Sequence, residues 1–359
     1  GLAPLLVDSI DKWLGRLPGR LGLLAVSAGT LFSTLTGTSI ASTAMLGSIL
    51  VPQMEKQGYR KPMSLGPILG SGGLAIMIPP SSLAVLLGAI GEISIGRILI
   101  AIIIPGLLMA ILYAAYIIIR CWLQPSIAPV YEMAPIPLSE KLRATVWYIL
   151  PLGLIIFLVV GVIFLGIATP SEAAATGTIG TMILIFFYGR LTWEVIKKSI
   201  GSALAVVGMV LLIIAGATAF SQILAYSGAT QGLGKLATEL PVAPIMIIIA
   251  MQVIILFLGC LMDVVAIMMI TLPIFVPVVL HLGFNPVWFA VIFLLNIEMA
   301  GTTPPFGMGL MVMKGVAPPG TTMGDIYRAA LPFLGCDFIV MVLIIAFPFL
   351  ALWLPGLMF

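Results

Sequence analysis

The chain has 359 residues, of which 61% are hydrophobic and only 8% charged, and its formal net charge is +3 at pH 7. Because an ordinary globular domain carries about 25% charged residues, this composition excludes such a domain and indicates a protein of the lipid bilayer. The small positive charge does not indicate nucleic-acid binding, since almost all Lys and Arg lie in short gaps between apolar runs. Residues 98–119, 147–167 and 338–354 approach or reach the roughly 20 apolar residues that cross a bilayer as a helix. The sequence therefore predicts an all-α, polytopic membrane protein.

The first third of the chain consists of short apolar segments interrupted by Gly, Pro and small polar residues. Residues 1–20 carry spaced charges among apolar residues, which predicts an amphipathic helix lying on the membrane surface. Two apolar arms within 21–57 are each too short to span and are joined at Thr36–Ser39, which favours a re-entrant hairpin. The elements expected next are a span over 66–90 broken at Pro79-Pro80, a plain span over 95–120 and a cytoplasmic linker over 121–143.

The rest of the chain begins with scaffold helices and a connecting loop, predicted over 144–243. A second repeat over 244–359 follows. It is expected to contain a hairpin over 244–281, a broken span over 287–313 and a last helix over 329–355.

The residues that interrupt helices recur at a spacing of about 225 residues. Pro52, Gly58, Tyr59, Pro79 and Pro80 correspond to Pro277, Gly283, Phe284, Pro304 and Pro305. A duplicated pair of interrupted hydrophobic segments is typical of the binding site of a secondary transporter. Three helix-length segments precede the second copy but only 1–20 precedes the first, so two or three further helices are expected upstream.

Positive residues predict the orientation of the two copies, because Lys and Arg concentrate on the cytoplasmic side of membrane proteins. If the hairpins enter from opposite faces, nearly all Lys and Arg fall on one side, and only Arg97 and Lys235 fall on the other. The first hairpin then opens to the cytoplasm and the second to the outside. The sequence therefore predicts an inverted repeat.

The two proline pairs predict a place for a cation. Proline has no amide hydrogen, so within a helix it leaves the carbonyl oxygen four residues earlier without its partner. The oxygens expected to be free are those of Ala75 and Ile76 before Pro79-Pro80, and those of Ala300 and Gly301 before Pro304-Pro305. Such oxygens must be buried in protein or face a cavity or an ion, and the hydroxyls of Thr302 and Thr303 add further ligands that suit sodium. The alternative is a simple kink at each pair.

Two acidic residues lie within apolar stretches of the second repeat. Asp263 occupies the predicted tip of the second hairpin, and a carboxylate at membrane depth is a functional candidate by default. It is expected to coordinate a cation or stabilise the tip, the alternative being an Asp near the interface. Glu298 precedes Pro304 by about one and a half turns and could serve as a proton or hydrogen-bonding group, or simply pack.

The other polar residues of the sequence give less evidence of a functional role. Thr169-Pro170-Ser171-Glu172 has the spacing of a capping box with proline at the first helical position, which favours a structural role for Thr169 and Glu172. Asp337 has no visible partner in the sequence. One histidine and three isolated cysteines give no metal-ligand spacing and no nucleophile–base pair, so no cofactor and no enzymatic chemistry are expected.

At these residues the chain resembles the large membrane subunit of the tripartite ATP-independent periplasmic transporters, the TRAP family. The similarity rests on Thr36-Gly37-Thr38-Ser39-Ile40-Ala41 with Gly47 and Pro52, Ile78-Pro79-Pro80-Ser81, Thr169-Pro170-Ser171-Glu172-Ala173-Ala174, Met262-Asp263, Gly283-Phe284-Asn285-Pro286 and Thr302-Thr303-Pro304-Pro305-Phe306-Gly307. It extends over essentially the whole chain. Only the family's first scaffold helices lack a counterpart.

The resemblance implies an elevator-type, sodium-coupled importer of organic acids in the bacterial inner membrane. It also implies two partners, a small four-helix membrane subunit and a periplasmic substrate-binding protein. The implied sodium sites lie at Gly37, Thr38, Ser39 and the break before Pro79, and at Asp263, Gly301, Thr302 and Thr303. The implied substrate position is near Ser42, Pro80, Ser81 and Pro305, with Pro79 and Pro304 as structural residues.

Three alternatives stay open at this point. A sodium- or proton-coupled carrier of the same architecture could work without a binding protein. A channel or passive scaffold subunit would tolerate loss of Asp263. An intramembrane enzyme would need a nucleophile–base pair, and none is found in the sequence.

Overall fold

The computed structural model describes residues 3–358 except 16, 130–135, 230–231, 233, 236–238 and 240. Every regular element in those ranges is helical, and five helices are long and apolar enough to cross a membrane, or six if the bent pair of α4 (Lys61–Met77) and α5 (Ser82–Ile90) counts as one span. The prediction of an all-α, polytopic membrane protein is therefore confirmed. Part of the connecting loop expected at the end of the 144–243 region, namely residues 230–231, 233, 236–238 and 240, lies outside the described residues.

The first helix is amphipathic, but its apolar face is covered by protein. Helix α1 (Ala3–Leu14) buries Leu6, Val7 and Ile10 and packs against α2 (Arg20–Thr36). Its charged face carries Lys12, which pairs with Asp8 and with Glu140 of α8. Protein covers this apolar face, since an amphipathic pattern reports only that one face is removed from water. The position of this helix at the membrane surface stays a prediction.

The first hairpin consists of α2 and α3 (Ser39–Lys56), joined at Gly37 and Thr38. Gly37 has φ +60°, a left-handed conformation that favours glycine and closes the tight tip. The hairpin packs on α4 (Lys61–Met77), where a Cβ on Gly72 would lie 1.9 Å from Thr43 Oγ1 of α3. The hairpin and α4 therefore form one close-packed body.

Helix α4 breaks before Pro79 and continues as α5 (Ser82–Ile90) at an angle of 43°. The broken span begins at Lys61 rather than at residue 66, because Pro62 suits the first turn of a helix. The predicted span over 95–120 consists of α6 (Ile95–Ala101) and α7 (Ile103–Leu123).

The scaffold starts earlier than the sequence predicted. After the short η1 (Pro125–Ile127), a helical run of 27 residues extends from Leu138 to Phe164. Its parts are α8 (Leu138–Ala144), η2 (Thr145–Ile149), α9 (Leu150–Ile156), η3 (Phe157–Gly161) and α10 (Val162–Phe164). The sequence predicts that the charged residues at 140–143 belong to the linker. In the structure they form the first turns of this helical run, directly after Pro137. Helices α11 (Pro170–Phe187) and α12 (Trp193–Tyr226) complete the scaffold.

The second repeat has the same order of elements as the first. It contains α14 (Pro244–Gly259), α15 (Val264–His281), α16 (Pro286–Thr302), α17 (Met308–Val316), α18 (Met323–Ala346), α19 (Phe349–Leu352) and η4 (Pro355–Leu357). The last helix begins before the predicted residue 329, because Thr322 and Asp325 form a capping box at its start. It ends at Ala346, where the chain bends into α19.

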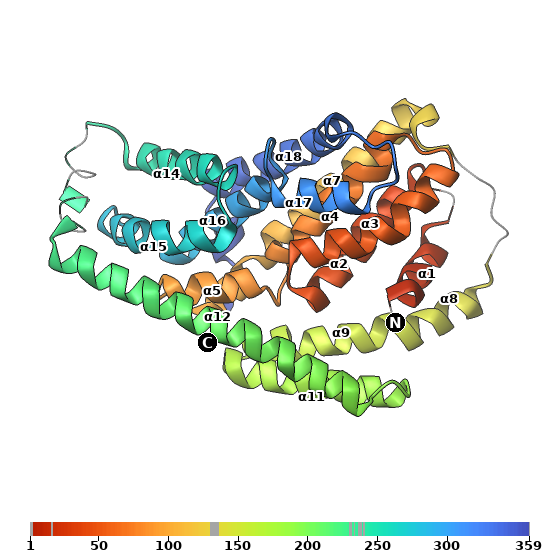
Figure 1. Ribbon diagram of the computed structural model, residues 1–359, viewed down its shortest axis with the longest axis horizontal. Helices are drawn as coiled ribbons and strands as arrows, with labels where there is room; N and C mark the ends of the chain where they lie inside the picture. Colours follow the sequence, from red (N-terminus) through yellow and green to blue (C-terminus); the bar gives the residue numbers. More distant parts are fainter. Residues whose placement is uncertain are drawn as a thin grey trace.

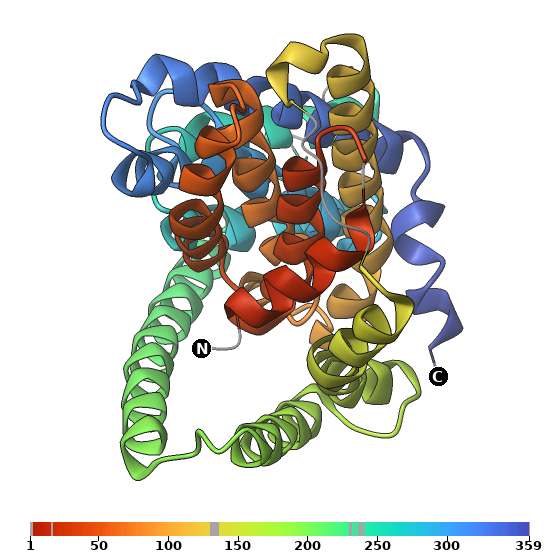
Figure 2. The ribbon, with the colours of Figure 1, turned by 90° about the vertical axis from the view of Figure 1, so that its right-hand side faces the viewer.

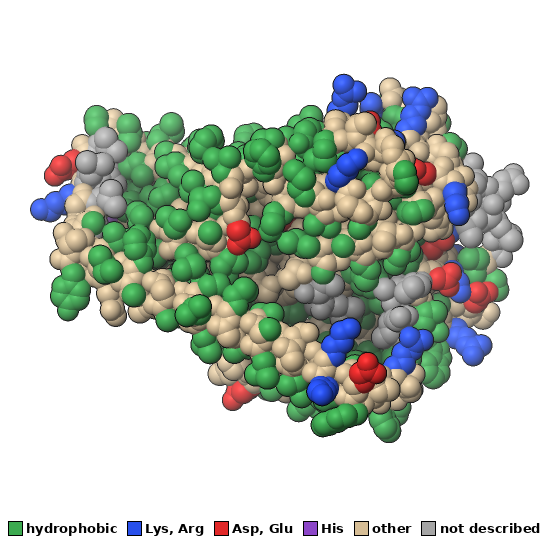
Figure 3. Space-filling view, viewed as in Figure 1, with side chains coloured by type: hydrophobic (Ala, Val, Ile, Leu, Met, Phe, Trp, Pro, Cys, Tyr) green, Lys and Arg blue, Asp and Glu red, His purple; other side chains and the backbone are tan. Residues whose placement is uncertain are grey.

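The two hairpins occupy opposite ends of the long axis, α2–α3 at one end and α14–α15 at the other (Figure 1). Turned by 90°, the molecule shows α11 and α12 as an arm beside this body (Figure 2). Lys and Arg side chains gather at the end that holds α8, and few lie at the end where α14 begins (Figure 3).

Two helices form the centre of the molecule. Every residue of α4 from Met63 to Met77 is buried, as is every residue of α16 from Val287 to Ala300. A helix that is apolar on all sides is stable only when it is surrounded. These two helices, each ending at a proline pair, pack against each other.

Candidate cation and substrate site

The tip of the first hairpin meets the break of the first buried helix. The Ser82 hydroxyl donates a hydrogen bond of 2.7 Å to the Gly37 carbonyl oxygen. A Cβ on Gly37 would lie 3.6 Å from the Pro80 carbonyl oxygen. The predicted residues Gly37 and Pro80, far apart in the sequence, are therefore neighbours in space.

Backbone oxygens are available on both sides of this contact. Helix α4 ends with the Ile78 amide donating to Leu74, and no amide follows in register for Ala75 and Ile76, since prolines occupy the next two positions. Both residues are buried. The Ser39 carbonyl oxygen lies 3.4 Å from the position of a Cβ on Gly72. The first tip and the first break thus both carry neutral oxygens, and neither has a charged side chain of its own.

The tip of the second hairpin meets the second break in the same way. The Cys260 thiol lies 3.8 Å from the Pro304 carbonyl oxygen, and a Cβ on Gly259 would lie 2.1 Å from the Ala300 Cβ. On the other side of the break, the Tyr327 hydroxyl donates to the Pro305 carbonyl oxygen at 2.9 Å. Contact between tip and break is therefore a feature of both repeats.

Asp263 has a defined structural task at the second tip. Its side chain accepts the Val265 amide at 2.9 Å and caps the amino terminus of α15. The residue is exposed. Of the roles considered from the sequence, this geometry supports stabilisation of the tip. The cap uses one carboxylate oxygen, Oδ2, and the other, Oδ1, takes no part in it.

The carbonyl oxygens before Pro304 differ from the prediction in one respect. The Thr303 amide donates to the Ala300 oxygen at 3.3 Å, so the expectation that Ala300 has no donor is wrong. A tightened last turn satisfies it, as often happens at helix ends. The Thr302 and Thr303 hydroxyls both donate to Met299, at 3.2 and 2.6 Å, and each retains lone pairs on its oxygen.

Three of the predicted substrate residues, Ser42, Pro80 and Ser81, belong to the first hairpin and the first break, whereas Pro305 belongs to the second break. Ser42 and Ser81 are buried, and the Ser42 hydroxyl has no hydrogen-bond partner in the described part of the chain. The Ser81 side chain caps α5 by accepting the Ala84 amide at 3.4 Å. Pro80 borders a cavity of about 530 Å³ whose other walls come from α9, η3, α11, α12 and the turn before it. The first break therefore opens toward the scaffold.

The sequence did not predict the surroundings of two acidic residues that lie in the centre of the molecule. Glu298 and Asp337 are each only 2% exposed, and the Tyr113 hydroxyl of α7 donates to the Asp337 carboxylate. Tyr113 was missed because its partner is 224 residues away and no local pattern marks it. The only sequence signal for this pair was the acidic residue Asp337 within an apolar helix.

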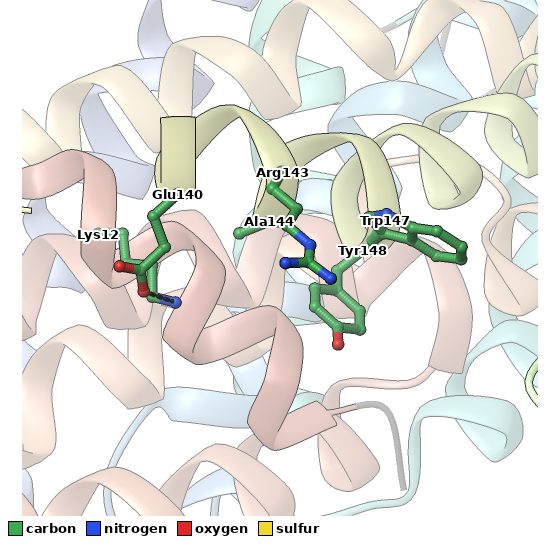
Figure 4. Close-up of a pocket in the computed structure, with 6 residues that line it drawn as sticks. All are labelled: Lys12, Glu140, Arg143, Ala144, Trp147 and Tyr148. Carbon is green, nitrogen blue, oxygen red and sulfur yellow. Dashed lines mark ion pairs between the residues drawn. The ribbon is translucent and has the colours of Figure 1, made fainter. Parts of the chain in front are cut away.

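The pocket beside α1 is separate from these residues. Lys12 of α1 faces Glu140 of α8, with an N–O distance of 2.9 Å, and Arg143 and Tyr148 lie along the same wall (Figure 4). None of the predicted site residues lines it. The ion pair of Lys12 with Glu140 joins α1 to α8 of the scaffold. Hydrogen bonds to Glu140 and Asp8 raise the pKa of the Lys12 amine.

The capping box at the start of α11 is present. The Thr169 amide donates to Glu172 at 2.8 Å, and the Thr169 hydroxyl accepts the Glu172 amide at 3.4 Å. The Thr169 hydroxyl also donates to the Glu172 carboxylate, at 2.8 Å. The hydrogen bonds from the Thr169 amide, first, and from the Thr169 hydroxyl lower the pKa of the Glu172 carboxyl. Thr169 and Glu172 are thus structural residues of the scaffold.

Crossing helices, two hairpins and two interrupted buried helices define a membrane transport protein rather than an enzyme. The family model "Tripartite ATP-independent periplasmic transporter, DctM component" matches residues 1–350, and the chain belongs to this family. It is a large permease subunit of the inner membrane, of a class that imports carboxylates and other small organic acids with a periplasmic binding protein and a small membrane subunit.

The relatives of this chain are named after different substrates. The chain is 31% identical to the C4-dicarboxylate TRAP transporter large permease protein DctM of Pseudomonas aeruginosa, over 99% of this chain and 82% of that protein. It is 27% identical to the sialic acid TRAP transporter permease protein SiaT of Haemophilus influenzae, over 100% of this chain and 57% of that protein. The solved YdaH transporter of Alcanivorax borkumensis shares the fold, with a TM-score of 0.62 and 17% identity over 96% of this chain and 84% of that one.

Proposed function

We propose that this permease imports a small organic acid by sodium-coupled secondary transport, with the acid delivered by an external binding protein. The observation that carries the proposal is the repeated contact between a hairpin tip and a helix break, Gly37 with Ser82 and Cys260 with Pro304. Such breaks supply unpaired carbonyl oxygens within a protected interior, as sodium coordination requires.

Each contact supplies one proposed sodium site. The first is formed by oxygens of Gly37, Thr38, Ser39, Ala75 and Ile76, and the second by oxygens of Asp263, Ala300, Gly301, Thr302 and Thr303. In the second set, Ala300 shares its oxygen with the Thr303 amide. A carbonyl oxygen has two lone pairs, so that hydrogen bond leaves a position for an ion.

The substrate carboxylate is proposed to bind between the two sites, near Ser42, Ser81 and Pro305. None of these residues is cationic, so the negative charge must be met by backbone dipoles or by bound sodium. Helices α3 and α5 begin at the first tip and break, and α15 and α17 begin at the second. The amino end of a helix favours an anion, since its first amides have no partner in the helix.

We propose an elevator movement, which the packing supports. The hairpins, α4 and α16 are closely packed together, whereas α11 and α12 have mostly exposed surfaces. We propose that the first group moves as one body against the scaffold and carries both cation sites with it. Alternating access of this kind needs one body to slide without losing its own packing.

The partners are proposed as a small membrane subunit and a periplasmic binding protein. One relative is the isethionate TRAP transporter permease protein DctMQ, of which this chain covers 55%. We propose that in this system the small subunit covers part of the exposed scaffold.

The test is uptake into proteoliposomes that contain this chain with its small subunit, driven by an inward sodium gradient or a matched potassium gradient. Uptake should require both sodium and the loaded binding protein. Equal uptake with potassium would refute sodium coupling, and uptake of free substrate at the same rate would refute delivery by a binding protein.

A further inference from the structure

One position in the two repeats is filled by a single side chain. Gly73 of α4 and Glu298 of α16 correspond in the repeat, since they have the same spacing as Pro79 and Pro304. The Glu298 carboxylate lies over Gly73, so that a Cβ on Gly73 would be 1.4 Å from Oε1 and 2.8 Å from Oε2. The absent side chain of one repeat thus makes room for the acid of the other.

The Glu298 carboxyl group is buried and incompletely bonded. Its residue is 2% exposed, and Oε1 has no hydrogen-bond partner in the described part of the chain. The groups that interact with it electrostatically are Asp337 of α18 and Tyr113 of α7, neither of which is cationic. A buried carboxylate without a cationic neighbour costs several kcal/mol unless it takes up a proton or a cation compensates it.

The two proposed sodium sites contain little negative charge of their own. Gly73 lies four residues before the end of α4, and Glu298 lies four residues before the end of α16, so the carboxylate is held about one helical turn from both helix ends. The oxygens at the first site are all neutral. The acid at the second, Asp263, is exposed and caps α15.

We infer that Glu298 is the shared counter-charge of both proposed sodium sites, a positioning residue that acts on each ion through its field. This inference rests on the proposed function. It adds a residue that links the two sites, because one carboxylate between two cations favours their joint occupancy. In an interior of low polarity this attraction acts over several ångströms.

The test measures thermal unfolding of the complex as a function of sodium concentration, with choline keeping the ionic strength constant. Glu298→Gln keeps the shape and removes the charge, so the sodium concentration for half-maximal stabilisation should rise about tenfold or more. The exchange Gly73→Glu with Glu298→Gly returns the carboxyl to the same place from the other repeat. It should restore that concentration to within about threefold of the wild type.

Glu172→Gln is the matched control, because it makes the same chemical change in the scaffold and should leave the sodium dependence unchanged. An unaltered sodium dependence in Glu298→Gln would overturn the inference. If that variant does not fold, Glu298→Asp takes its place: it keeps the charge and should keep the sodium response, and loss of the response in a folded Asp variant would count against the inference. A wild type without sodium-specific stabilisation would instead refute the sodium sites themselves.

Discussion

Gly259→Ala should separate the second hairpin tip from the second break. The new Cβ would lie 2.1 Å from the Ala300 Cβ and 3.3 Å from its Cα. Two carbons in favourable contact are about 3.5–4.0 Å apart, so the tip must retreat by more than about 1 Å. Neither atom belongs to a flexible side chain. We therefore expect a loss of about 1–3 kcal/mol, as for other overpacked cores.

The assay is thermal unfolding of the purified complex together with sodium-driven uptake. Gly208→Ala on α12 is the control, since no atom lies within 4 Å of its new Cβ, and it should be neutral or slightly stabilising. Adding Ala300→Gly to Gly259→Ala removes the nearest contact and should restore part of the lost stability. An unchanged unfolding temperature and unchanged uptake in Gly259→Ala would show that contact between the second tip and the second break does not affect stability or transport.

Three further outcomes are expected. Asp263→Ala removes the cap of α15, costs about 1 kcal/mol and impairs coupled uptake with expression intact, whereas unaltered uptake would remove Asp263 from the cation site. Tyr113→Phe leaves the buried Asp337 carboxyl without its donor and should lower stability by about 1–3 kcal/mol in thermal unfolding. The lowered pKa of Glu172 stabilises the start of α11 above its ordinary pKa of 4.5, and this contribution is lost as the pH falls through the folded value. Hydrogen exchange of the α11 first turn should follow that titration, and Glu172→Gln should abolish the pH dependence.

The sequence allowed the fold to be predicted well because its strongest signals are local. Apolar runs mark the crossing helices, and the spacing of Thr169 and Glu172 marks a helix start. Helix ends were less accurate where charges lie inside a first turn, as at residues 140–143 of α8. The amphipathic pattern of α1 could not reveal whether protein or lipid covers it.

The candidate site was predictable only where the repeat itself carries information. The proline pairs, the small residues of the first tip and Asp263 at the second tip mark the two sites, and the structure brings tip and break together. The contacts across the centre of the molecule could not be predicted in this way. Tyr113 with Asp337, and Gly73 with Glu298, join positions about 225 residues apart, and only the packing of α4, α7, α16 and α18 creates them.

Helix α12 has a consequence for how the protein must be handled and assembled. Of its 34 residues, only Ala217 is buried, so nearly its whole surface depends on whatever surrounds the chain. Apolar surface of that extent is an aggregation hazard in water. The subunit should therefore survive membrane extraction poorly when produced alone, and co-expression with whatever protein covers α12 should decide its yield.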